Sequence, residues 1–427
     1  MGVEVCAVPG HPRGVTPRRS WHRATIAAGL ALLSVLGMIL VSIHVSPRQV
    51  VAGDAHYVFA SARSLAYDGD LDLTNQYAVM GDRWGLGRDP THDGWRLPPR
   101  EIGASLVMVP GLWLHHLAGI APRWEPTCAC LLAAASLGIC WLGCARIVDT
   151  LELGPRRAEL LAGAAVLGFV VPFYALGSAG YAHAPDAAIC AWLCWALLKG
   201  RGPLSTGVLL ACAVLTRMQN VLWLLWPAVE VLAPPSATDR RDQLRRVAII
   251  ASVGALGFAP QLWLGLAHPG SARGSLGWTL AFFNLDDYLF DLARVQVGVH
   301  GLLRWTPIAA LALLGLALAD RRSPNARALG PLAVFVGLWL LLAAVRDVDG
   351  GDAFGARRMA GIVGILALGL GHAWSRIAGR GPDARPWTAW SLAAALTLAV
   401  VVNLGRTHQA IVGELSLTSP DRSGGRR

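Results

Sequence analysis

Long apolar segments alternate with short polar ones along most of this chain of 427 residues. The first apolar segment, Ala24 to Val45, follows an arginine-rich stretch and is long enough to cross a membrane, because about 20 helical residues span the hydrocarbon core. The apolar part of a cleavable signal peptide is shorter, so we expect an uncleaved first span preceded by a cytoplasmic segment, residues 1–21. Ten further candidate spans follow: Cys128–Ala145, Leu160–Leu176, Pro185–Leu198, Leu204–Leu215, Val221–Leu232, Val247–Leu266, Trp305–Leu318, Leu329–Ala344, Gly361–Trp374 and Trp387–Leu404.

Positively charged residues orient these segments, since cytoplasmic loops of membrane proteins carry an excess of arginine and lysine. The main basic groups are Arg156/Arg157, Lys199/Arg201, Arg240–Arg246, Arg321–Arg327 and Arg376–Arg385. From a cytoplasmic N-terminus, eleven spans place all of these groups in the cytoplasm and the C-terminus outside, provided that the apolar segment Gly103–Leu117 does not cross. Pro110, His115 and His116 suit a helix at the membrane boundary, so we expect Gly103–Leu117 to be interfacial or re-entrant.

The pattern therefore predicts an all-α polytopic membrane protein with a transmembrane domain over residues 22–404. Its outer segments are expected to be a large first loop, residues 46–102, which carries amphipathic interfacial helices, and further loops at residues 267–304 and 345–358. These loops combine aromatic, acidic and basic residues, whereas the inner loops are plainly basic. The outer tail, residues 405–427, is polar and is predicted to be disordered.

Composition agrees with a membrane protein and argues against other classes. With 54% hydrophobic residues and a mean hydropathy of +0.47, the chain is too apolar for a soluble domain. The net charge of +10 does not indicate a nucleic-acid partner, because the basic residues form short clusters between apolar segments. Of the eight cysteines only Cys6 lies in a polar segment, which argues against disulfides. The pairs Cys140/Cys144 and Cys190/Cys194 are expected to pack in the core rather than to bind a metal.

Charged residues return abruptly after the first span, in the stretch Val51–Tyr77. Its first carboxylate, Asp54, stands just outside the membrane, where an ionisable group is costly and usually functional. Further on, Asp68, Asp70 and Asp72 alternate as in a calcium loop, but the glycine and the acidic residue that such a loop needs downstream are absent. The sequence therefore predicts no metal and no other cofactor, although a divalent cation is left open.

Two motifs in the first outer loop, G-D-A-H-Y and S-L-A-Y-D-G-D-L-D-L-T-N-Q-Y, resemble the first extracytoplasmic loop of bacterial GT-C superfamily glycosyltransferases. These enzymes are relatives of the protein mannosyltransferases and of the aminoarabinose transferase that modifies lipid A. Further motifs match in the same order: R-E-I-G-A-S-L-V-M-V-P-G (Arg100–Gly111), Y-A-H-A-P-D-A (Tyr181–Ala187), L-T-R-M-Q-N (Leu215–Asn220), H-G-L-L-R-W-T-P (His300–Pro307) and F-G-A-R-R-M (Phe354–Met359). The resemblance covers most of the chain from Val50 to the region of Leu370.

The resemblance implies a GT-C-type bundle of about 11 transmembrane helices in the bacterial inner membrane. It also implies transfer of a glycosyl group from a polyprenyl-phosphate donor to an acceptor at the outer face, by an inverting displacement. Asp54 matches the acidic residue of the first loop, and a carboxylate there can act as general base on the acceptor hydroxyl. Many relatives carry a second carboxylate next to it, whereas here Ala55 follows, which disfavours a metal-assisted version. The sugar, the carrier length and the acceptor stay open.

The leaving group of this reaction is a lipid phosphate, which arginine binds through two parallel hydrogen bonds. Arg357 matches the arginine of the family's F-G-P-R-type segment, although Ala356 replaces the proline. Arg217 is the second candidate for the donor phosphate; the alternative is an arginine that snorkels to the interface. His183 is either a cavity residue or half of a polar pair with Asp186 at a helix start. The residues expected to line the substrate cavity are His56, Tyr57, Glu101, His183, His300 and Arg304.

Two other classes of protein compete with the enzyme. A transporter or flippase of lipid-linked sugars predicts ionisable residues at mid-membrane depth and internal repeats, and we find charges at the outer ends of spans and no repeat. A non-catalytic membrane scaffold needs no set of acidic, basic and histidine residues on one side. The expected partners are therefore the lipid-linked donor, an unknown acceptor and membrane lipids, with no nucleic acid.

Overall fold

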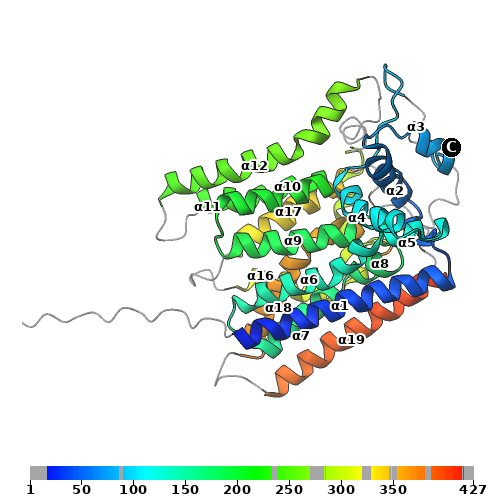
Figure 1. Cartoon of the computed structure of the whole chain (residues 1–427). Coiled ribbons are helices and arrows are strands. Elements are labelled where there is room, and N and C mark those ends of the chain that lie inside the picture. Colours follow the sequence, from blue (N-terminus) through cyan, green and yellow to red (C-terminus); the bar gives the residue numbers. More distant parts are fainter. Residues whose placement is uncertain are drawn as a thin grey trace, which may run out of the picture.

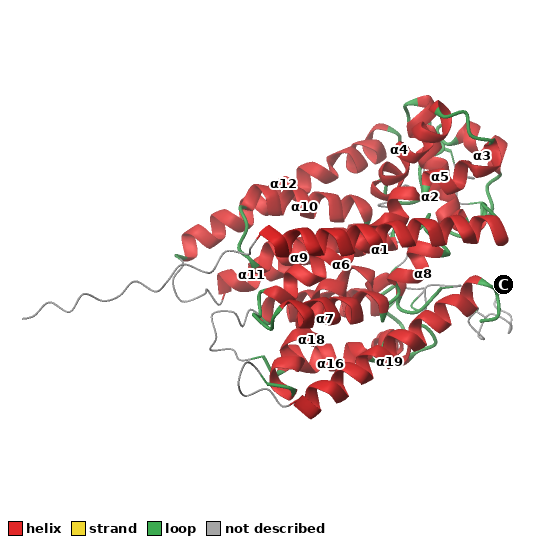
Figure 2. Ribbon diagram, turned by 60° about the horizontal axis from the view of Figure 1, so that its bottom comes forward, coloured by secondary structure: helices red, strands yellow, loops and turns green. Residues whose placement is uncertain are grey.

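The first long helix, α1 (Pro17–His44), runs the length of a helical bundle (Figure 1). The computed structural model describes residues 17–85, 90–232, 239–269, 283, 285–319, 328–345, 348, 353–379, 386–415 and 417. Figures 1 and 2 show the other long helices lying side by side with α1. They are α6 (Leu131–Asp149), α7 (Pro155–Leu167), α9 (His183–Leu198), α10 (Pro203–Thr216), α11 (Leu225–Leu232), α12 (Arg240–Ala267), α16 (Ile308–Ala317), α17 (Leu329–Ala343), α18 (Val363–Ile377) and α19 (Pro386–Ile411).

Each segment predicted as a span overlaps one of these helices, so the helical prediction is confirmed. Five stretches of the described chain are long and apolar enough to cross a membrane on their own: Trp21–His44, Pro122–Asp149, Arg240–Ala267, Arg357–Ile377 and Pro386–Ile411. A sixth arises if Tyr288–Trp305 and Ile308–Ala317, bent by 103° at their junction, form one broken span. The chain is therefore a multi-pass membrane protein by helix composition, and the number of eleven spans stays a prediction.

Short helices gather at one end of the bundle, on the right of Figure 1, which we call the loop end. They are η1 (Gln49–Val51), α2 (Ala55–Arg63), η2 (Ser64–Asp68), α3 (Thr74–Met80), α4 (Gly103–Leu117), η3 (Pro122–Trp124), α5 (Glu125–Ala129) and α8 (Val171–Leu176). The remaining short helices are η4 (Met218–Leu224), α14 (Tyr288–Val297), α15 (Leu302–Trp305) and η5 (Arg357–Ile362). The predicted interfacial helix is thus α4. It packs on α2, where Ser105 donates a hydrogen bond of 2.9 Å to the Val58 carbonyl; its depth in the membrane stays a prediction.

Glycines bring the central helices into backbone contact. A Cβ at Gly315 of α16 would collide with the backbone oxygen of Gly369 in α18, and one at Gly138 of α6 would collide with that of Ala27 in α1. Apolar side chains gain little from leaving lipid for protein, so close approach at small residues is what holds such helices together. The core of the bundle therefore forms around α6, α9 and α18, the most buried of the long helices.

One predicted span is interrupted in the structure, and a buried asparagine holds the break. The segment Leu160–Leu176 divides into α7 and α8, and Asn403 of α19 donates to the carbonyls of Leu167 and Phe169 at 2.8 and 2.7 Å. A second break falls between two predicted spans, after α10, where Arg217 is extended (φ −155°, ψ 117°) before η4 begins. Breaks of this kind expose backbone groups that must find partners, because a membrane offers no water to satisfy them.

Several predicted segments fall wholly or partly outside the described residues. Most of the N-terminal segment 1–21, the basic group Arg321–Arg327, and much of the loops 267–304 and 345–358 lie there. In the predicted outer tail, 405–427, helix α19 continues to Ile411 and ends at the loop end (Figure 1), and most residues beyond 415 are not described. The described residues contain no β-sheet, only a single bridge between Phe283 and Val345.

Candidate active site

The carboxylate of Asp54 contacts two arginines that are distant in sequence. Asp54 immediately precedes α2, at the loop end. Nη2 of Arg100 donates to its Oδ1 at 2.7 Å, and Nη2 of Arg357 donates to its Oδ2 at 3.4 Å. The side chain of Asp54 is 25% exposed, so this ion-paired carboxylate is still open to a second molecule.

A tyrosine from the loop between α8 and α9 fixes the backbone at Asp54. The Asp54 N–H donates to the hydroxyl of Tyr181 at 3.3 Å. The preceding Gly53 has a φ of +67°, and a Cβ there would collide with the same hydroxyl. Only glycine combines this left-handed backbone with such a close approach. The motif V-A-G-D is therefore explained locally: Gly53 turns the chain against Tyr181 and presents Asp54 at the start of α2.

Arg357 is held by aromatic residues on the segment that leads into η5. The Phe354 ring stacks on the ring of Phe173, with the two centroids 4.6 Å apart. The backbone N–H of Phe354 donates to the hydroxyl of Tyr174 at 3.1 Å. Gly355 then turns the chain with a φ of +57°. The guanidinium of Arg357 lies over the ring of Tyr181, 5.4 Å from its centroid, where a cation–π contact orients it toward Asp54.

Arg217 and Glu101 lie beside this cluster and hold its backbone. Nη1 of Arg217 donates to Nδ1 of His183 at 2.6 Å and to the carbonyl oxygen of Arg357 at 3.3 Å. Glu101 accepts a hydrogen bond of 3.2 Å from the backbone N–H of Met218, the residue after Arg217. The structure thus brings Asp54, Arg357, Arg217, His183 and Glu101 into one connected group.

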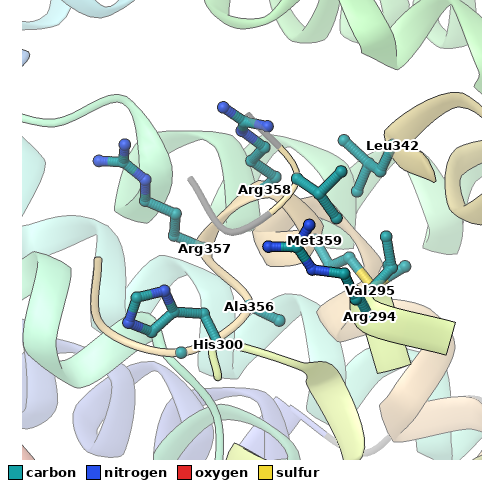
Figure 3. Close-up of a pocket in the computed structure, with 10 residues that line it drawn as sticks. Arg294, Val295, His300, Leu342, Ala356, Arg357, Arg358 and Met359 are labelled. Atoms are coloured by element: carbon teal, nitrogen blue, oxygen red, sulfur yellow. The ribbon is translucent and has the colours of Figure 1, made fainter. Parts of the chain in front are cut away.

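A cation-rich cavity opens beside Arg357. It encloses about 340 Å³, its open mouth included. Its walls are Arg294, Val295, His300, Leu342, Val348, Gly355, Ala356, Arg357, Arg358 and Met359. Figure 3 shows His300 and three arginines arranged around it, on α14, on the loop after α14, and on η5. Arg357 therefore belongs both to the cavity wall and to the ion pairs of Asp54.

The fold of this chain is similar to that of solved membrane proteins. No protein-family model and no curated protein sequence matches the chain. Among solved structures it matches the oligosaccharyltransferase AglB of Archaeoglobus fulgidus, in complex with an inhibitory peptide and a dolichol-phosphate, with a TM-score of 0.55, 11% identity, and coverage of 92% of this chain and 56% of that chain. The apo form of the oligosaccharyltransferase from that organism matches with a TM-score of 0.57 and 12% identity over 95% of this chain and 57% of that one.

A shorter solved protein matches as well. ArnT from Cupriavidus metallidurans, bound to undecaprenyl phosphate, gives a TM-score of 0.50 and 12% identity over 94% of this chain and 75% of that chain. This chain has the GT-C glycosyltransferase fold. The resemblance found in the motifs is thereby confirmed at the level of fold. The chain spans little more than half the length of the archaeal oligosaccharyltransferases.

Of the six residues predicted to line the substrate cavity, Glu101 and His183 lie in the group around Asp54 and not in the cavity wall, and three others lie away from both. His56 Nε2 is 2.8 Å from the carbonyl oxygen of Gly81, and the Tyr57 hydroxyl donates to Asp82 at 2.8 Å, so both side chains brace the loop after α3. Arg304 is exposed on α15 and is not among the residues that line the cavity. His300, in contrast, is 6% exposed and forms part of the cavity wall.

Other residues of the site were missed by the sequence prediction. Arg100 was noted only as the start of a motif, yet it makes the shortest ion pair of Asp54. Arg358 and Arg294 line the cavity, and Tyr181 contacts both Asp54 and Arg357. A usable signal was present for Arg100, because an arginine directly before an apolar helix at the outer face is a candidate partner for a nearby carboxylate.

The acidic turn after η2 uses its carboxylates for its own folding. Asp68 accepts hydrogen bonds from the side chains of Asn75 and Gln76. The Ser64 hydroxyl donates to Asp70 at 2.8 Å, and the backbone N–H of Arg96 donates to Asp72 at 3.0 Å. Within the described ranges, no group of three His, Cys, Asp or Glu residues is placed to hold a metal ion.

The charge state of Asp54 follows from its surroundings. Burial opposes ionisation of the carboxyl, but the guanidinium groups of Arg100 and Arg357 outweigh it and hold the pKa of Asp54 below its ordinary value of 3.8. The ligand-free site therefore contains a carboxylate anion neutralised by arginines. As long as both arginines stay in contact, this carboxylate is a weak base.

Proposed function

We propose that this chain transfers a glycosyl group from a polyprenyl-phosphate-linked donor to an acceptor at the outer face of the cytoplasmic membrane, with Asp54 as general base in an inverting displacement. The observation that carries the proposal is the position of Arg357, which contacts Asp54 at 3.4 Å and also lines the cation-rich cavity. Arg357 then connects the base with the anion site. A reaction that deprotonates an acceptor and releases a phosphate needs both a base and an anion site. Two neighbours in fold, AglB and ArnT, were solved with polyprenyl-type phosphates, which supports this donor class.

In the proposed reaction the donor phosphate enters the cavity and contacts Arg357, Arg358 and Arg294. The acceptor oxygen attacks the anomeric carbon while its proton passes to Asp54. The bond from the anomeric carbon to the phosphate oxygen breaks, and its electron pair leaves on the lipid phosphate. Guanidinium groups that already face the phosphate stabilise the charge it gains, which is the larger part of catalysis in such displacements.

Donor binding would also raise the basicity of Asp54. The phosphate and Asp54 compete for Arg357, whose contact with the carboxylate is long, at 3.4 Å, whereas Arg100 holds the other oxygen at 2.7 Å. When Arg357 turns to the phosphate, the carboxylate loses one stabilising charge and its pKa rises. The base is then strengthened only when a donor is present, while Arg100 keeps it in place.

The proposal predicts that the purified chain in liposomes transfers radiolabelled sugar from polyprenyl-phosphate sugars to acceptors in added membrane extract. One polyprenyl phosphate should be released for each sugar transferred, measured by thin-layer chromatography. Arg358→Ala should slow transfer, whereas Arg304→Ala, which removes an exposed arginine outside the cavity, should not. Movement of intact lipid-linked sugar across the bilayer without transfer would instead identify a flippase.

The depressed pKa of Asp54 predicts a flat pH profile for the free enzyme. A group with a lowered pKa stays ionised, and keeps its ion pairs, until the pH falls through that low value, so kcat/KM should show no acid limb from Asp54 between about pH 5 and pH 8. Steady-state kinetics with limiting donor measure this. Arg100→Gln removes one guanidinium and should move the acid limb to higher pH. A wild-type acid limb near pH 6 that Arg100→Gln leaves in place would contradict the assignment.

A further inference from the structure

A buried polar pair lies beneath the arginines of the site, inside the bundle. Asp186 of α9 is 0% exposed and Asn220 of η4 is 3% exposed. Nδ2 of Asn220 donates to Oδ1 of Asp186 at 2.6 Å and to the carbonyl oxygen of Ala213 in α10 at 2.9 Å. This one amide therefore joins three helices at the break after α10. The proposed reaction makes no use of either side chain.

The pair fixes the turn from Arg217 to Asn220 on both sides. The Arg217 N–H donates to the same Ala213 carbonyl at 2.9 Å, and the Asn220 N–H donates to the Arg217 carbonyl at 2.9 Å. These two backbone bonds have helical spacing, the first at the end of α10 and the second at the start of η4, and Arg217 between them is extended. Side chains join the turn to α9, through the hydrogen bond from Asn220 to Asp186 and the one from Arg217 to His183.

The segment from Arg217 to Asn220 also holds the backbone of the two donor-binding arginines, Arg357 and Arg358. Nη1 of Arg217 donates to the carbonyl oxygen of Arg357 at 3.3 Å, and Nε2 of Gln219 donates to that of Arg358 at 2.6 Å. Two consecutive peptide groups are thus fixed from one side. The side chain of Arg357 contacts Asp54, and Arg357 and Arg358 both line the cavity. The turn therefore fixes the backbone positions from which these two side chains extend.

A glycine lets η5 approach the same polar pair. A Cβ added at Gly361 would lie 3.3 Å from Oδ1 of Asn220 and 3.4 Å from Oδ2 of Asp186, with Sγ of Cys190 at 3.1 Å. These distances leave the backbone of η5 in direct contact with the pair. Asn220 and Asp186 therefore act on η5 in two ways, through the turn at Arg217 and by packing against Gly361.

We propose that Asn220, anchored by Asp186, is a positioning residue for Arg357 and Arg358. It touches neither substrate nor reacting atoms, and it holds the segment from which the two guanidinium groups reach the lipid phosphate. Binding and catalytic groups must be held to within about 0.5 Å of the productive geometry, so a shift of η5 weakens their contacts. This inference rests on the proposed function, because it assumes that these arginines bind the donor phosphate.

The test compares binding of undecaprenyl phosphate in nanodiscs by the wild type and by Asn220→Ala. The dissociation constant should rise about tenfold in the variant. Asn403→Ala is the matched control. Asn403 is also buried, at 4% exposure, and also donates to two groups, the carbonyls of Leu167 and Phe169. Its loss should lower the unfolding temperature as Asn220→Ala does, without changing the affinity for the phosphate.

A double-mutant comparison separates positioning from general stability. In an Arg357→Ala, Arg358→Ala background the effect of Asn220→Ala on phosphate binding should largely vanish, because the residues through which it acts are gone. An undiminished further loss would overturn the inference. Gly361→Ala provides a variant that removes no buried polar group. We expect weaker binding in the same direction, because the added methyl lies 3.1 to 3.4 Å from Cys190, Asn220 and Asp186 and forces a small shift between η5 and these side chains.

The outcomes also distinguish this inference from the proposed function. If the wild type binds undecaprenyl phosphate and both Asn220→Ala and Gly361→Ala bind it equally well, Asn220 does not position the arginines and the proposed function is unaffected. If the folded wild type does not bind undecaprenyl phosphate at all, the proposed donor class fails, and the inference fails with it. A rise in the dissociation constant confined to the two variants, with Asn403→Ala unchanged, supports both.

Discussion

Asp54→Asn is expected to abolish glycosyl transfer while the protein still binds the lipid phosphate. The substitution keeps the shape of the side chain and an oxygen that can accept the 2.7 Å hydrogen bond from Arg100. It removes the negative charge that would take the acceptor proton. Loss of a general base typically costs about 10²- to 10⁴-fold in rate, so transfer should fall close to background. The measurement is transfer of labelled sugar at matched protein level.

The Asp54→Asn variant should also bind undecaprenyl phosphate several-fold more tightly than the wild type does. In the ligand-free site the Asp54 carboxylate is itself an anion bound by Arg357, so an incoming phosphate must displace it. An amide competes less strongly for the guanidinium. Tighter binding together with lost transfer is therefore expected, whereas a residue that only positioned Arg357 would give weaker binding when altered.

Asp70→Asn is the control for the loss of a loop carboxylate. Asp70 lies in the same segment between α1 and α4, and its Oδ1 accepts hydrogen bonds from the Ser64 hydroxyl and from the backbone N–H of Asp72. Transfer and phosphate affinity should both stay near the wild-type level. Unchanged transfer by Asp54→Asn would remove this carboxylate from the chemistry, whatever its effect on binding.

The helices were predictable because each membrane span appears in the sequence as a continuous run of apolar residues. An apolar run must form a helix to satisfy its backbone in lipid, so each predicted span contains one. The interruptions were not predictable in the same way. Leu160–Leu176 is one apolar run, and it divides into α7 and α8 where Asn403, far along the chain, supplies partners for the freed carbonyls. Hydropathy does not report such a partner.

Asp54 was predictable for a local reason and its neighbours on α2 were not. A carboxylate directly after a span stands out in the sequence. His56 and Tyr57 follow it closely, but successive residues of a helix point about 100° apart, so side chains near Asp54 in sequence face the loop at Gly81 and Asp82 instead. Proximity along the chain therefore overestimated their part in the site.

The cationic half of the site depends on contacts that the sequence does not encode locally. Arg100, Arg294 and Arg358 stand on separate segments, and only the folded bundle brings them near Asp54 and the cavity. Arg357 and His300 could be proposed from the motifs, because the resemblance supplied information from other folded chains. Polar residues at the ends of spans were correctly expected to gather, but which of them meet depends on tertiary packing.

Arg357→Ala is expected to have the second largest effect, a loss of about 10²- to 10³-fold in kcat/KM. Arg357 contacts Asp54 and also lines the cavity, so its removal weakens donor binding and leaves the leaving phosphate less stabilised. Arg357→Lys keeps the charge but loses the planar fork that binds two phosphate oxygens at once. It should therefore recover only part of the activity. Arg304→Lys, on the exposed face of α15, is the control and should behave as wild type.

Combining Asp54→Asn with Arg357→Ala measures whether Asp54 competes with the phosphate for Arg357. If Asp54 weakens phosphate binding by occupying Arg357, its substitution can tighten binding only while Arg357 is present. Asp54→Asn should then leave the dissociation constant for undecaprenyl phosphate unchanged in the Arg357→Ala background, although it tightens binding in the wild type. Equal tightening in both backgrounds would mean that the carboxylate repels the phosphate through the general field of the site, or competes for Arg100. The two readings differ in one number, the coupling between the substitutions, which the four dissociation constants give directly.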